Sequence, residues 1–88
     1  MNLSALDYVK TEVRVLVDYQ IDYFNKFGIC IHTGFVLVGN YDQALFLAAL
    51  GAIDGEYSSF QITNRSTGIT YPRVTDARRE LELLQGDD

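Results

Sequence analysis

The chain has 88 residues, a net charge of −5 and 48% apolar residues, which suits one small globular domain and is too short for two. The acidic balance disfavours nucleic acid and anionic lipid surfaces as partners, because both carry phosphate groups that repel it. A single cysteine excludes an intrachain disulfide. We therefore expect one compact domain over residues 1–88, with residues 86–88 as a frayed acidic tail.

The first residues and the lengths of the apolar runs indicate where in the cell the protein is expected. The opening MNLSALDYVK lacks the basic region and apolar core of a signal peptide. No apolar run reaches the roughly 18–20 residues that a membrane-spanning helix needs. We expect a cytoplasmic protein without a membrane partner, located in the host cytoplasm if a phage encodes it.

Apolar residues at helical spacing predict a first helix from about Ala5 to Phe27. Ser4 can cap its start, and Gly28 can end it in the left-handed conformation. The β-branched run at residues 13–17 would favour a strand, but the longer helical pattern outweighs it. The residues that follow this pattern are Leu6, Val9, Val13, Leu16, Val17, Phe24 and Phe27.

The remaining elements follow in order. Two short apolar runs, Ile29 to Ile31 and Phe35 to Val38, predict a β-hairpin that turns at residues 32–34. Asn40 with Gln43 resembles a capping box before a second helix, about Tyr41 to Ile53, which is apolar all round and is expected to be buried.

The C-terminal third predicts a second hairpin and a last helix. The hairpin pairs FQIT (residues 60–63) with GITY (residues 68–71), and the helix runs from about Asp76 to Gln85. The predicted order is α-β-β-α-β-β-α. We therefore expect an α+β fold, with an antiparallel sheet built from two hairpins and helices packed on one face.

The first predicted helix carries the strongest candidate for a binding surface. On a helix, Asp7, Asp18 and Asp22 form one row, and the tyrosine that follows each aspartate forms a neighbouring row. Boundary tyrosines can simply pack their rings inward, but tyrosine is also frequent at interfaces and carboxylates attract basic partners. The predicted partner-binding residues are Tyr8, Asp18, Tyr19, Asp22 and Tyr23.

No residue pattern indicates catalysis, a metal site or a cofactor. Cys30 and His32 would share a face of a strand, but the chain has no further cysteine or histidine to complete a zinc site. A further hypothesis assigns phosphate or nucleic-acid contacts to four arginines near the C-terminus, although acidic residues are interspersed with them. These are Arg65, Arg73, Arg78 and Arg79.

The sequence therefore favours a non-enzymatic protein–protein interaction module, which could act as a small acidic inhibitor on a basic surface of its partner. Some phage-encoded inhibitors are similarly small and acidic, a likeness of size and charge only. A homodimer through the apolar helix from Tyr41 to Ile53 is also expected to be feasible. One alternative is a small enzyme or ligand-binding domain with a pocket near His32 and Asp54. Another is a nucleic-acid-binding or oligomeric assembly protein that uses the arginine-rich third.

Overall fold

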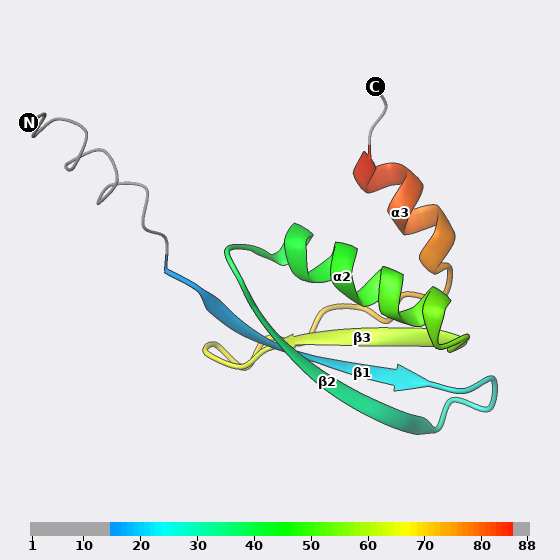
Figure 1. The fold of residues 1–88 in the computed structure, drawn as a ribbon. Coiled ribbons are helices and arrows are strands. Elements are labelled where there is room, and N and C mark those ends of the chain that lie inside the picture. Colours follow the sequence, from blue (N-terminus) through cyan, green and yellow to red (C-terminus); the bar gives the residue numbers. More distant parts are fainter. Residues whose placement is uncertain (1–14, 86–88) are drawn as a thin grey trace, which may run out of the picture.

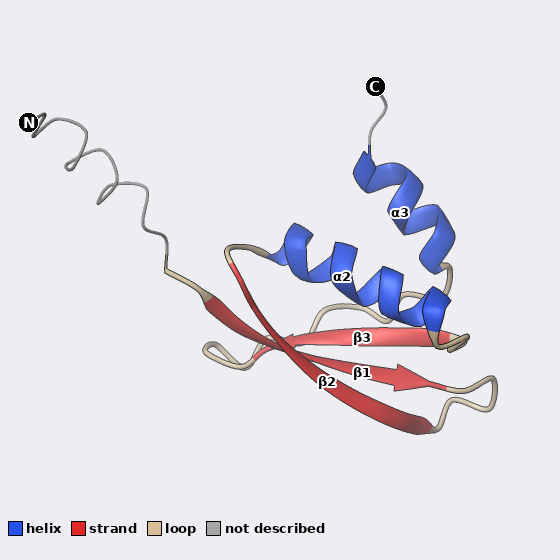
Figure 2. Ribbon diagram, in the orientation of Figure 1, coloured by secondary structure: helices blue, strands red, loops and turns tan. Residues whose placement is uncertain are grey.

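The computed structural model describes residues 15–85 and contains a three-stranded antiparallel sheet with two helices on one side of it (Figures 1 and 2). The strand order is β2-β1-β3. The expected α+β class with an antiparallel sheet is confirmed. No helix within residues 15–85 has the length and apolar character to cross a membrane. The elements are β1 (Val17–Phe24), β2 (Cys30–Val38), α2 (Tyr41–Asp54), β3 (Ser59–Asn64) and α3 (Ala77–Gln85).

The helix predicted from Ala5 to Phe27 is wrong where the structure describes it, because residues 17–24 form the central strand β1. Its residues 5–14 lie outside the described part. A separation of four residues suits the period of a helix and also the period of a strand, so the apolar spacing was ambiguous. Neighbouring strands on both sides decide the matter, since β1 pairs with β2 and with β3.

The first predicted hairpin is wrong, because its two predicted arms, residues 29–31 and 35–38, fall along one strand except for Ile29, and the hairpin that forms joins β1 to β2. Residues 32–34 lie inside the continuous strand β2, and the turn falls at residues 25–29. The Asn25 side chain accepts hydrogen bonds from the N–H groups of Phe27 and Ile29, at 2.9 and 3.1 Å. Gly28 has φ 80°, so it does adopt the left-handed conformation, but in a β-turn rather than at a helix end.

The second predicted helix is confirmed as α2. Asn40 Oδ1 accepts from the Gln43 N–H at 2.9 Å, and Gln43 Oε1 accepts from the Gly39 N–H at 2.8 Å. The helix lays a face of small residues on the sheet, so its backbone can approach the strands closely. Leu47 and Leu50 remain partly exposed. A homodimer through this helix would have to bury these two side chains, and it stays a prediction. The residues of the buried face are Ala44, Leu45, Ala48, Ala49 and Ala52.

The second predicted hairpin is present, but only its first arm is a regular strand. β3 is its first arm, and residues 69–74 return beside it through the isolated bridges Thr63↔Thr70 and Phe60↔Val74. The returning segment thus covers the outer edge of β3. The last helix, expected from Asp76, begins at Ala77 as α3, where Asp76 Oδ1 accepts from the Arg79 N–H at 3.1 Å.

The core lies between the sheet and α2. Phe60 and Ile62 of β3 are the largest fully buried side chains, and the inward residues of β1 join them. α3 packs beside α2 and adds Leu81 and Leu84 to the rim of this core. Within residues 15–85, helices therefore lie on one face of the sheet and no helix lies on the other (Figure 2).

Candidate functional site

The predicted stripe of aspartates and tyrosines divides between the two faces of the sheet. Tyr19 and Tyr23 point toward α2 and are 4% and 7% exposed. Asp18 and Asp22 project from the opposite face, because successive side chains of a strand alternate. Tyr8 lies outside the described residues. An offset of one position gives adjacent rows on a helix but opposite faces on a strand, so the two tyrosine rings are core rather than surface.

The hydroxyl group of the buried Tyr23 is hydrogen-bonded, and burial affects the pKa of both tyrosines. Tyr23 donates to the backbone carbonyl of Ala48 at 3.2 Å, and its ring stacks on Tyr57 with 4.6 Å between centroids. Burial raises the pKa of Tyr23, and the neighbouring Tyr57 raises it further. Burial also raises the pKa of Tyr19, with a smaller contribution from Tyr71. Both phenols therefore remain neutral at ordinary pH, which suits a structural role.

The uncovered side of the sheet carries the alternative surface. Phe35 and Leu37 of β2 are 56% and 63% exposed there. Sequence reasoning missed them. Side chains of a strand point alternately to its two faces, so the prediction of a strand at residues 35–38 already implied that Phe35 and Leu37 share one face and that Val36 and Val38 share the other. We call this surface the open face and define it by its outward residues from the three strands. They are Asp18, Gln20, Asp22, Thr33, Phe35, Leu37, Gln61 and Thr63.

The two predicted aspartates are held within this open face. Asp18 Oδ2 lies 3.2 Å from Arg65 Nη1 in an exposed ion pair, and the Arg65 guanidinium lies 4.9 Å from the centroid of the Phe35 ring. Asp22 Oδ1 accepts from Thr33 Oγ1 at 2.8 Å and from Gln20 Nε2 at 3.1 Å. The open face thus combines acidic, basic and apolar groups.

The four predicted arginines occupy three separate places. Arg65 pairs with Asp18 at one end of β1. Arg73 covers the Phe24 ring at the other end, with 3.6 Å between its guanidinium carbon and the ring centroid. Arg78 and Arg79 belong to α3. Within residues 15–85 these arginines therefore do not form one basic surface, and a role in nucleic-acid binding stays a prediction.

Cys30 and His32 do not share a face, contrary to the expectation from their spacing. The register of β1 and β2 shifts between Tyr23 and Phe24, so β2 holds one extra residue at this point. The exposed Cys30 Sγ lies 3.7 Å from Thr33 Oγ1, whereas His32 stacks on Tyr23 on the helix side. Among residues 15–85 no group of three potential metal ligands occurs.

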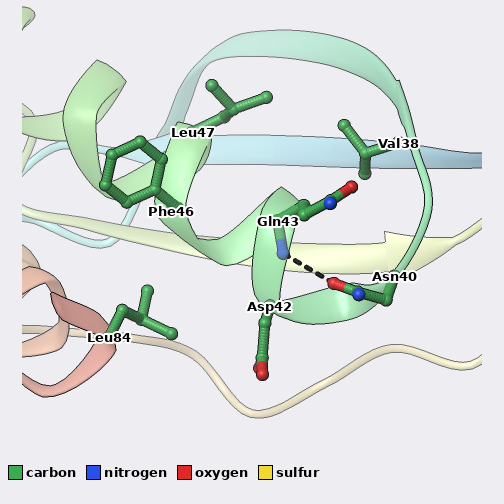
Figure 3. A pocket seen from close by; sticks show the side chains of 7 residues that line it. All are labelled: Val38, Asn40, Asp42, Gln43, Phe46, Leu47 and Leu84. Carbon is green, nitrogen blue, oxygen red and sulfur yellow. Dashed lines mark hydrogen bonds between the residues drawn. The ribbon is translucent and has the colours of Figure 1, made fainter. Parts of the chain in front are cut away.

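Among the hollows on the helix side of residues 15–85, two bear on the candidate functions. The smaller has a volume of about 230 Å³ and is lined by His32 and Asp54, with the rings of Tyr23 and Tyr57 between them. The larger, about 480 Å³, is lined by Phe46 and Leu47 of α2, by Leu84 of α3 and by Val38 at the end of β2 (Figure 3). Its polar side chains come from the start of α2, where Asn40 and Gln43 form the cap and Asp42 lies in the first turn, and its other lining residues are apolar.

Comparison of the chain with protein-family models, curated proteins and solved structures finds no match. Function must therefore be inferred from the geometry of this chain alone.

Proposed function

We propose that the chain is a non-enzymatic protein–protein interaction module that binds its partner through the open face. The observation that carries this proposal is the unequal covering of the sheet: helices cover one face, while Phe35 and Leu37 stay more than half exposed on the other. Neighbouring apolar side chains left in water by a small domain are typical of an interaction surface.

The acidic residues specify the kind of partner. Asp18 and Asp22 are four residues apart on one strand, about 13 Å along it, and both border the apolar pair. The exposed ion pair of Asp18 with Arg65 contributes only about 0–1 kcal/mol, so a basic side chain of a partner can compete for the carboxylate. A surface with lysine or arginine around an apolar centre would therefore fit the open face, as the acidic-inhibitor hypothesis requires.

Two pairs of substitutions test this proposal. We expect Asp18→Lys with Asp22→Lys, and separately Phe35→Ser with Leu37→Ser, to weaken partner binding by about tenfold or more, because each removes one half of the complementarity. The partner is captured from cells of the source organism with the wild-type protein as bait. Affinities are then measured by calorimetry with the purified partner.

The matched control reverses the same number of charges on the helix side, with Asp42→Lys and Glu82→Lys, and should bind like the wild type. Circular dichroism establishes that each variant is folded. Unchanged affinity in both open-face variants would rule out this surface as the binding site.

A second candidate function rests on the smaller hollow. It lies between His32 and Asp54, where the sequence predicts a ligand pocket, and its aromatic walls with one carboxylate suit a small organic cation. A bound ligand would raise the melting temperature of the wild-type protein. Tyr57→Ala removes one wall and should abolish that increase, whereas a library of small amines with no effect on the wild type would count against this function.

A further inference from the structure

The outer edge of β2 is a second surface, distinct from the open face. β2 is an edge strand of nine residues, and no described element pairs with its outer side (Figure 1). The opposite edge of the sheet is different, because residues 69–74 cover β3. Within residues 15–85, β2 thus presents the free edge of the sheet.

The hydrogen bonds of β3 establish which groups of β2 face outward. Tyr71 N–H donates to the Ile62 carbonyl at 2.9 Å, and Asn64 N–H donates to the Ile69 carbonyl at 2.8 Å. Ile62 and Asn64 therefore direct their backbone groups away from β1. The antiparallel ladder alternates, so the residues of β2 with outward N–H and C=O groups are Thr33, Phe35 and Leu37.

This edge lacks the features that keep natural sheets from pairing with each other. Its sequence, CIHTGFVLV, contains no lysine, arginine, aspartate, glutamate or proline. The chain as a whole carries a net charge of −5, which would repel a second copy at most surfaces. At this strand a second copy brings no lysine, arginine, aspartate or glutamate of β2 close to a residue of the same charge.

We propose that β2 pairs antiparallel with β2 of a second copy, about a two-fold axis at Gly34. Gly34 is the middle residue of the strand, so this register gives the longest overlap. It sets Ile31 opposite Leu37 and Thr33 opposite Phe35, which brings apolar side chains together. Because β2 is the free edge and meets its own counterpart, the contact closes at two copies instead of continuing into a fibre.

The extent of this contact determines its strength. Pairing over nine residues would bury roughly 1,000 Å² in total, at the lower end of specific interfaces. The dimer is therefore reversible. It joins the two sheets into one six-stranded sheet and places the two open faces side by side, but it does not depend on the open face having a partner.

A cysteine at the axis tests the register. In the variant Cys30→Ser with Gly34→Cys, the two new thiols meet at a close, non-hydrogen-bonded pair, about 4.5 Å between Cα atoms, which suits a disulfide. An added Cβ at Gly34 has no atom within 4 Å, so the protomer tolerates it. The matched control is Cys30→Ser with Leu37→Cys, whose two thiols would lie about 20 Å apart in this register.

In sedimentation equilibrium we expect the wild-type protein to shift from monomer to dimer as its concentration rises. Under mild oxidation we expect the Gly34→Cys variant to form the intermolecular disulfide at least tenfold faster than the Leu37→Cys control. The Asp18→Lys, Asp22→Lys protein should dimerise like the wild type, which separates this pairing from the open-face proposal. A wild type that stays monomeric at all concentrations, or equal linking of the two cysteine variants, would overturn the proposed dimer.

Discussion

Replacement of Phe60 by alanine is expected to lower the free energy of unfolding by about 3–5 kcal/mol. Phe60 is 0% exposed and belongs to the core between the sheet and α2, with its ring centroid 6.2 Å from that of Tyr23. The substitution removes the buried ring and leaves a cavity that the alanine face of α2 cannot fill. In a domain of this size, such a loss is a large share of the total stability.

Phe35→Ala provides a matched control, since it changes the same residue type in the same sheet. Phe35 is 56% exposed on the open face, so we expect a loss of about 1 kcal/mol or less. Urea denaturation followed by circular dichroism measures both variants. If the Phe60→Ala protein is too unstable to fold, the Phe60→Leu protein should still fold and should show a smaller loss of unfolding free energy than expected for Phe60→Ala. Equal effects at positions 60 and 35 would contradict the described packing.

Replacement of Gly51 by alanine is expected to destabilise the protein by about 1–3 kcal/mol, although alanine is the better helix former by about 1 kcal/mol. A Cβ at position 51 would clash with the Tyr23 hydroxyl oxygen. That oxygen is held by its hydrogen bond to Ala48, so the ring cannot move without losing the bond. The glycine therefore makes room for Tyr23 beneath the helix.

A double variant tests this cause. Tyr23→Phe removes the hydroxyl that meets the new methyl group, so Gly51→Ala should cost less in the Tyr23→Phe background than in the wild type. Gly34→Ala is the control, because the added Cβ there has no atom within 4 Å, and its cost should be close to zero. Strictly additive effects of the two substitutions at 23 and 51 would refute the proposed clash.

The elements that could be predicted from the sequence are those with signals contained in a few neighbouring residues. Asn40 and Gln43 cap α2 as their spacing indicates, because an N-cap depends on groups within one turn. Gly28 adopts the left-handed conformation as expected, since the need for a positive φ is local. The start and end of β3 and α3 were also close to their predicted positions.

The central strand could not be predicted in the same way. Apolar residues at positions 13, 17 and 24 satisfied a helical pattern, while Val17, Tyr19, Ile21 and Tyr23 also satisfied the alternation of a strand. Backbone groups of β1 find partners in β2 and β3, which are distant in the sequence. That long-range pairing decided between two patterns that the residues alone allowed.

The sequence by itself determined the size and acidic charge of the chain, its α+β class and the position of helix α2, because these follow from composition and short-range spacing. The tertiary structure decided which side chains form a surface. Once residues 17–24 lie in a sheet, the aspartates turn to the open face and the tyrosines to the core, and Phe35 and Leu37 come to lie beside Asp18. The physical reason is that exposure depends on what packs against each face, and those contacts join residues far apart in the chain.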